Sequence, residues 1–276
     1  EYGMQSFPSM SMVESFTHKR DRSLYSDVMN VHQKASLGTG NLMKYVENYY
    51  HVNDDFDSVV GLTQIMQAEA IRFAVEAHRR NMPYCMGTLY WQFNDCWPVI
   101  SWSSIDYGGN WKALHYAARK FFSPLLVSMR DFDNKIEIHV VNDQHHEVES
   151  EIRLELFNFN GDTLFNDSSD IKVEPFSSVI YHVFDKDDLL GGSDPSAIIF
   201  RADLFVGGKV LSRAHQFFKR PKHLSIPSPE FDFEIERVSG KYVITVRSKS
   251  FLCQLHLIST KVRGVFSDNY FNMLPG

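Results

Sequence analysis

The sequence has little cysteine, no long apolar run and no excess of positive charge. Its three cysteines, Cys85, Cys96 and Cys253, are odd in number and show no CxxC spacing, so neither a disulfide framework nor a zinc knuckle is indicated. No apolar run approaches the ~20 residues of a membrane span, and no charged segment followed by an apolar one opens the chain. We therefore expect no membrane partner, no metal and no cofactor, and the cellular compartment stays open.

The balance of charge argues against nucleic acid as a partner. The formal net charge is −6 and the isoelectric point is about 6.1. A nucleic-acid binder needs clustered Lys and Arg to neutralise phosphates, and no such stripe is present.

With 276 residues, 43% of them hydrophobic, the chain has enough material for about two domains. The first residue is Glu rather than Met, and we therefore expect a processed or excised piece of a longer protein.

The first 122 residues are predicted to mix helices with a buried strand. Residues 1–60 are irregular and polar, typical of loops with short helices. Apolar positions then recur at spacings of three and four over residues 59–80, which predicts an amphipathic helix that ends at a proline. Residues 86–94 are apolar and aromatic, as in a strand buried on both faces, and residues 111–122 predict a second helix. This order of elements is typical of an α/β barrel.

The pattern changes near residue 123. From residue 125 to 219 apolar and polar residues alternate with period two, interrupted by turns at residues 131–134 and 160–161, which predicts an antiparallel β-sandwich. After a proline-rich hinge at residues 221–229, the alternation resumes in three further segments, which are residues 231–237, 242–247 and 252–257. A second sandwich is predicted to begin there, although about 50 residues is short for one.

The usual short catalytic motifs are absent, so carboxylates and aromatics remain. There is no HExxH, no GxSxG and no phosphate-binding loop. Residues 86–102 concentrate aromatic, amide and acidic side chains, which are Tyr90, Trp91, Gln92, Asn94, Asp95, Trp97 and Trp102. Sugars present apolar C–H faces and rings of hydroxyls, which need such partners. The alternative is a tryptophan-rich core strand followed by a capped loop.

Other polar groups point less clearly to function. His32 lies in a polar loop near the predicted site, but a lone loop histidine is more often solvated. His145 and its two neighbours suggest a turn rather than a metal site. Three aspartates around Asp187 do not fit the spacing of a calcium loop, so we predict a solvated turn. The aromatic residues of the segment 116–122 are assigned to core packing.

Four blocks in order resemble the β-mannosidase branch of glycoside hydrolase family 2. They are residues 1–8 (EYGMQSFP), 87–98 (GTLYWQFNDCWP), 101–106 (SWSSID) and 109–115 (GNWKALH), and residues 267–276 resemble a motif of the family's last domain. The resemblance implies a multidomain fragment of α/β plus all-β class. Residues 1–122 would be the C-terminal part of a (β/α)₈ TIM barrel, 123–220 an immunoglobulin-like β-sandwich, and 221–276 the truncated start of a second one.

The resemblance also implies the chemistry. In this family the Glu of a Ser-Glu-(Tyr/Phe)-Gly motif attacks the anomeric carbon, and Glu1 matches that position, so a retaining, exo-acting β-mannosidase is implied for the full-length protein. Retention needs two carboxyls, and the family's acid/base glutamate lies upstream of this chain. Trp91 would floor the sugar subsite, with Asn94 and Asp95 near its rim. Without the family, Glu1 is a terminal residue, and such residues are usually mobile and solvated.

Two other functional classes stay open. The fragment could be a non-catalytic carbohydrate-binding or scaffolding module, or the parent could act on β-glucosaminides or β-galactosides instead of β-mannoside oligosaccharides. Two of eight barrel strands cannot close a barrel, so exposed strand edges are expected to be covered by the upstream barrel domains of the parent chain or by self-association.

Overall fold

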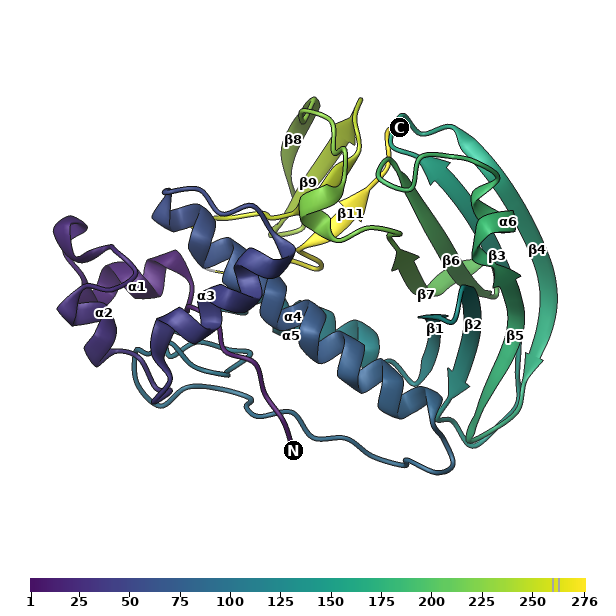
Figure 1. Cartoon of the computed structure of the whole chain (residues 1–276), viewed down its shortest axis with the longest axis horizontal. Helices are drawn as coiled ribbons and strands as arrows, with labels where there is room; N and C mark the ends of the chain where they lie inside the picture. Colours follow the sequence, from purple (N-terminus) through teal and green to yellow (C-terminus); the bar gives the residue numbers. More distant parts are fainter. Residues whose placement is uncertain (260, 263) are drawn as a thin grey trace.

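The computed structural model describes residues 1–259, 261–262 and 264–276, and its first 122 residues form a helical region. The helices in chain order are α1 (Met10–Phe16), η1 (Lys19–Asp21), α2 (Asp27–Val31), α3 (Gly38–Tyr49), α4 (Phe56–Arg80) and α5 (Ala113–Phe121). Helix α4 runs from the cluster of α1 to α3 toward the β-sandwich, with α5 beside it (Figure 1). No helix within the described residues has both the length and the apolar character needed to cross a bilayer.

Helix α4 confirms the helix predicted for residues 59–80. It begins where the Asp55 carboxylate accepts a hydrogen bond from the backbone N–H of Ser58 at 3.0 Å, which caps a free donor of the first turn. It ends at Asn81, after a last turn with three basic residues that suit the negative end of the helix dipole. The second predicted helix is also present, as α5.

The buried strand predicted for residues 86–94 is wrong. This segment is extended but forms only isolated bridges, and Leu89, Trp91 and Phe93 are 71%, 49% and 60% exposed. A strand is buried on both faces only when further strands and helices surround it, and within the described residues this one forms only isolated bridges, to Tyr2 and to Ile105. The described part of the first 122 residues thus contains helices and isolated β-bridges, and a barrel sheet is not seen in it.

The sandwich predicted for residues 125–219 is confirmed. Its strands are β1 (Leu125–Phe132), β2 (Lys135–Asn142), β3 (Val148–Asn158), β4 (Thr163–Val173), β5 (Ser177–Asp185), β6 (Ile198–Val206) and β7 (Lys209–Gln216). They form two antiparallel sheets, ordered β1-β2-β5 and β4-β3-β6-β7. Both predicted turns are present, and Asp133, Asn134 and Gly161 adopt the positive φ angles that tight turns require. Short helix α6 (Lys186–Leu190) joins the sheets.

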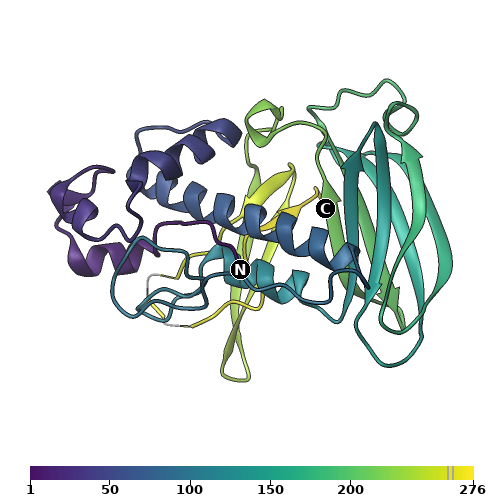
Figure 2. The same cartoon turned by 60° about the horizontal axis from the view of Figure 1, so that its bottom comes forward.

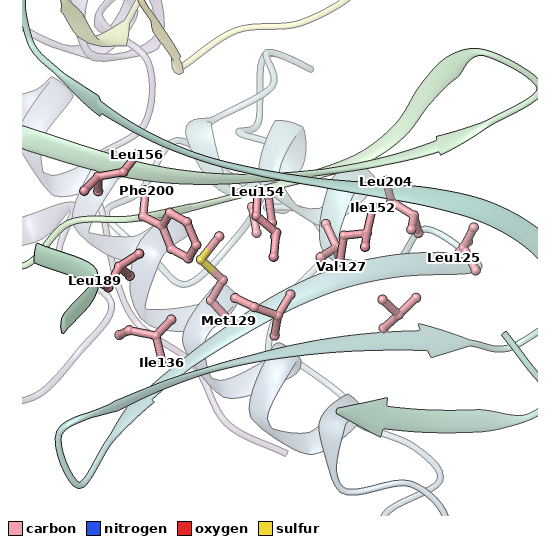
Figure 3. Packing of buried hydrophobic residues seen from close by; sticks show 14 of the residues in the cluster. Leu125, Val127, Met129, Ile136, Ile152, Leu154, Leu156, Leu189, Phe200 and Leu204 are labelled. Carbon is pink, nitrogen blue, oxygen red and sulfur yellow. The ribbon is translucent and has the colours of Figure 1, made fainter. Parts of the chain in front are cut away.

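The core of the sandwich comes from alternate residues of facing strands. Ile152 and Leu154 of β3 have no exposed surface, while Arg153 between them points to solvent. They pack against side chains such as Val127 and Met129 from the other sheet, as Figure 3 shows. The period-two pattern of the sequence therefore produces the two-layer core directly.

The segment after residue 220 forms two small sheets rather than a closed second sandwich. Its elements are η2 (Pro221–His223), the hairpin of β8 (Phe231–Val238) and β9 (Lys241–Ser248), and the pair of β10 (Leu252–Leu255) and β11 (Phe271–Met273). The three strands predicted from the sequence are present. The β8–β9 hairpin projects from the body of the molecule (Figure 2), and every residue of β8 is exposed.

The C-terminal end of α4 is anchored to the sandwich by buried polar groups. The Glu76 carboxylate, 6% exposed, accepts a hydrogen bond from the hydroxyl of Ser128 in β1 at 2.6 Å. Arg79, 7% exposed, donates to the backbone carbonyl of Phe121 at 2.6 Å and to the carboxylate of Asp143 at 2.8 Å. Because buried charges are costly unless paired, these contacts fix how the helical region sits on the sandwich.

Candidate functional site

The predicted site residues meet where the first residues of the chain run parallel to the segment around residue 90. Tyr2 and Tyr90 form a parallel β-bridge, and the backbone N–H of Trp91 donates to the carbonyl of Tyr2 at 2.7 Å. In this register Glu1 and Gly3 lie beside Leu89 and Trp91. The two segments are 88 residues apart in sequence, and helices α3 and α4 lie between them in the chain.

Alternation along these two segments separates a helix-facing side from an open side. Tyr2 and Tyr90 are half-buried against α4 and α5. The hydroxyl of Tyr2 is hydrogen bonded to Thr88 Oγ1 at 2.8 Å, which also contacts Nδ1 of His78 in α4 at 2.8 Å. Burial raises the pKa of Tyr2. Successive side chains of an extended segment point to opposite faces, so Glu1 and Trp91 share the open face.

Gly3 allows the two segments to approach closely. A Cβ atom at Gly3 would lie 2.4 Å from the carbonyl oxygen of Trp91 and 3.0 Å from the indole of Trp102. Real Cβ contacts are not this short, so any other residue would force the segments apart. The glycine two residues after Glu1 is therefore required by the position of Trp91.

Trp91 presents an open aromatic surface on the face that the register assigns to Glu1. Its side chain is 49% exposed, and the peptide bond between Trp91 and Gln92 is cis. Half-exposed aromatic rings provide the flat apolar surface against which the C–H face of a sugar can pack. A carboxylate and an aromatic platform thus share one face, which is the arrangement expected of a sugar subsite.

The other two predicted residues differ in exposure. Asn94 is exposed and its side-chain amide donates only to the neighbouring carbonyl of Asp95, at 3.2 Å, within the described residues. Asp95 is 5% exposed, and its two carboxylate oxygens accept hydrogen bonds from the hydroxyls of Ser101 and Ser103, both at 2.6 Å. The structure therefore places the Asp95 carboxylate inside the loop, while Asn94 faces outward.

His32 is not solvated, contrary to the expectation for a lone loop histidine. Its ring stacks between Phe16, at 4.0 Å, and Trp97, at 5.0 Å between centroids. Its Nδ1 lies 2.5 Å from the carbonyl oxygen of Pro98, so the ring links α2 to the loop after Trp91. A half-buried stacked ring of this kind has a structural role that sequence spacing does not reveal.

The remaining polar candidates are structural. No group of three metal-ligating side chains is found in the described ranges. His145 lies in the connection between β2 and β3, as expected. The aspartates around Asp187 are exposed, as predicted, but they belong to short helix α6 and its cap rather than to a turn, because Asp185 accepts hydrogen bonds from the backbone of the first turn. The aromatic segment 116–122 is mostly core, but its last residue, Phe122, is 42% exposed.

Comparisons with known proteins find similarities along the whole chain. Residues 134–223 match the family model described as a mannosidase Ig/CBM-like domain, and residues 226–276 match an Ig-fold domain. The crystal structure of a β-D-mannosidase from Dictyoglomus thermophilum superimposes with a TM-score of 0.89 and 27% identity over 99% of this chain. The chain is similar to β-mannosidases in sequence and in fold along its whole length.

The β-mannosidase relatives are all longer than this chain. A β-mannosidase from Capra hircus is 38% identical over 147 residues, covering 48% of this chain and 17% of that protein. β-Mannosidase A from Emericella nidulans aligns with all of this chain at 25% identity, and the alignment covers 33% of that protein. The Dictyoglomus structure is likewise covered to 33%. The chain thus spans between about a sixth and a third of its β-mannosidase relatives.

A second solved structure shows the same fold at greater distance. The exo-chitosanase of Amycolatopsis orientalis superimposes with a TM-score of 0.73 and 15% identity over 99% of this chain. At this identity the likeness concerns the fold alone, including the Ig-like domains that match the mannosidase family models.

Sequence reasoning missed the residues that support the candidate site without belonging to its open face. Gly3 is needed for close approach, and Ser101 and Ser103 hold Asp95. Lys112 is fully buried beneath the loop. Two features of the sequence could have suggested such a network: the serines spaced by two that follow an Asp, and the lysine directly before a helix. Surface loops have the same composition, so neither feature is specific.

Proposed function

We propose that this chain forms a C-terminal part of a retaining exo-β-mannosidase in which Glu1 is the nucleophile. The observation on which the proposal rests is the parallel register that sets Glu1 and Trp91 on one face. It is supported by the similarity of the whole chain to β-mannosidases. In this proposal residues 1–122 complete a (β/α)₈ barrel with upstream residues, 123–220 form one Ig-like domain and 221–276 begin another.

The mechanism requires two carboxyl groups about 5–5.5 Å apart. The Glu1 carboxylate attacks the anomeric carbon of the terminal mannose, and the leaving oxygen is protonated by an acid/base group outside this chain. Water then hydrolyses the glycosyl-enzyme ester, with the second carboxyl acting as base, so the configuration is retained. Glu1 is exposed on the open face, where a sugar ring could reach it.

The sugar contacts follow from the same face. Trp91 would support the apolar face of the mannose ring, and the outward amide of Asn94 would hydrogen bond to a hydroxyl at the rim. Asp95, with both oxygens already bonded to serines, would shape the rim through its loop rather than through direct contact.

The exposed aromatic face also supports a larger protein. Leu89 and Phe93 are 71% and 60% exposed on the same extended segment as Trp91, and Tyr84 in the turn before it is 96% exposed. Large apolar side chains exposed in such number are usually covered by another part of a protein. We propose that upstream barrel residues of the parent chain cover it and that a β-mannoside oligosaccharide is the ligand of the assembled site.

Replacement of Glu1 tests the proposal. In a full-length enzyme containing this chain, Glu1→Gln keeps the size of the side chain and removes the nucleophile, so turnover of an aryl β-mannoside should fall by on the order of 10⁴-fold or more. Glu14→Gln is the matched control, because Glu14 is 53% exposed and pairs only with Arg22 at the surface within the described residues.

Two results would contradict the proposal. Full activity of Glu1→Gln would remove the nucleophile assignment. Faster hydrolysis of the aryl β-glucosaminide or β-galactoside than of the mannoside would change the substrate class.

A further inference from the structure

Lys112, directly before α5, is a buried cation that the proposed chemistry does not use. Its side chain has no exposed surface, and its ammonium group donates to the hydroxyl of Ser103 at 3.5 Å. Burial lowers the pKa of Lys112 to about 7, opposed by the nearby carboxylates of Asp95 and Asp106. A buried ammonium group is retained only where opposite charges compensate for lost hydration.

The Asp95 carboxylate joins Lys112 to the loop that follows Trp91. The Ser103 hydroxyl, which accepts from Lys112, donates to Asp95 Oδ2 at 2.6 Å. Asp95 Oδ1 accepts from Gln92 Nε2 at 3.3 Å, and Gln92 is the residue bonded to Trp91. A chain of polar contacts thus runs from the ammonium group to the residue next to the aromatic platform.

The Asp106 carboxylate, whose charge also acts on Lys112, is bonded to the segment that follows Glu1. Asp106 is 2% exposed, and its Oδ2 accepts from the hydroxyl of Ser9 at 2.5 Å and from the Ser9 backbone N–H at 3.2 Å. Its Oδ1 accepts from the backbone N–H of Asn110 at 2.9 Å. Lys112 is therefore influenced by the charge of one carboxylate from each of two turns. One of those turns is bonded to the segment beginning with Glu1.

Helix α4 contributes neutral groups to this network. Gln67 Nε2 donates to the backbone carbonyl of Ser103 at 3.3 Å, and Gln64 Oε1 accepts from the backbone N–H of Ala113 at 3.4 Å. Asp95 and Asp106 are the charged groups that act on Lys112 in the described chain. Loss of the ammonium charge would leave two buried carboxylates without a counter-charge, and their hydrogen-bond partners would have to move.

We propose that Lys112 is a positioning residue whose buried ammonium group, bonded to Ser103 and balanced by the charges of Asp95 and Asp106, holds the loop after Trp91 in register with the segment after Glu1. The inference rests on the proposed function, because it concerns the geometry of that same site. Displacement of a sugar platform by about 1 Å lowers turnover by about 100-fold. Lys112 touches no substrate and acts through the two carboxylates.

The kinetic test uses variants of a full-length enzyme containing this chain. Lys112→Met preserves most of the side-chain volume without the charge, and kcat on an aryl β-mannoside should fall about 100-fold, with KM changed much less. Lys120→Met on the same helix is the control, since Lys120 is 51% exposed. Adding Asp95→Asn to Lys112→Met removes one uncompensated carboxylate, so the double variant should regain about tenfold in kcat relative to Lys112→Met alone.

A spectroscopic test needs no folded variant of Lys112. In the enzyme labelled with fluorotryptophan, the ¹⁹F resonance of Trp91, assigned through Trp91→Phe, should shift between pH 6 and 8 with a midpoint of about 7 as Lys112 loses its proton. A Trp91 resonance that stays constant over this range would overturn the inference, as would an unchanged kcat in Lys112→Met. The proposed function would survive both results, because it fails only if Glu1→Gln remains active or the mannoside is not the preferred substrate.

Discussion

Replacing Gly3 by Ala tests whether close approach of two segments builds the site. The added Cβ would lie 2.4 Å from the Trp91 carbonyl oxygen, and ordinary contact begins at 3.4 Å, so the segments must separate by about 1 Å. The 2.7 Å hydrogen bond from the Trp91 N–H to Tyr2 would then be stretched or lost. We expect kcat on an aryl β-mannoside to fall about 100-fold and the free energy of unfolding to fall by about 1–3 kcal/mol.

A glycine on the segment that contains Trp91 provides the control. A Cβ at Gly87 would meet nothing within 4 Å, and Gly87 does not adopt a positive φ. Gly87→Ala should therefore leave kcat unchanged and alter stability by less than about 1 kcal/mol. The measurements are steady-state kinetics and urea unfolding of the full-length enzyme. Equal activity of Gly3→Ala and Gly87→Ala would refute the claim that the approach of Gly3 to Trp91 sets the geometry of the site.

Two further predictions concern stability. Arg79→Met removes buried hydrogen bonds to Asp143 and to a carbonyl of α5, so the free energy of unfolding in urea should fall by about 2–3 kcal/mol. Arg153→Met, at a surface ion pair, is the control and should lower the free energy of unfolding by less than about 1 kcal/mol. Equal losses in the two variants would contradict the stabilising role of the buried Arg79 contacts. Burial, with a contribution from Arg213, lowers the pKa of His215 to about 3, below the usual value near 6.5, so between these values the unfolded chain binds a proton that the folded chain does not. Stability should therefore fall as pH drops from about 6.5 toward 3, and His215→Gln should reduce that slope in thermal melts; an unchanged slope would show that other groups cause it.

Elements defined by a local period were predictable. The helix at residues 59–80 and the alternating strands of the sandwich were found where the sequence placed them, because a 3.6-residue or two-residue repeat of apolar side chains can be buried in only one way. The segment at residues 86–94 was predicted as a buried strand from its composition, and it is exposed. Composition reports a tendency to be buried, whereas burial itself depends on neighbours.

The candidate site was predictable only in part. Glu1, Trp91 and Asn94 came from motifs, and the structure brings the segments containing Glu1 and Trp91 together by parallel pairing. Asp95 was predicted near the rim from the same family resemblance, but two serine hydroxyls hold its oxygens inside the loop. Whether a carboxylate faces a ligand or a protein donor depends on side-chain direction, which sequence spacing does not determine.

The sequence by itself determined the two-layer sandwich, the long helix and the motifs that relate the chain to β-mannosidases, because each depends on residues close together in the chain. Tertiary structure decided which distant residues meet. It set Gly3 against the carbonyl of Trp91, and it buried Lys112 against the hydroxyl of Ser103. Such contacts join segments up to about a hundred residues apart, and they arise only when the intervening helices pack. The sequence therefore determines the chemical types of Glu1 and Trp91, and the fold determines that they lie on one face.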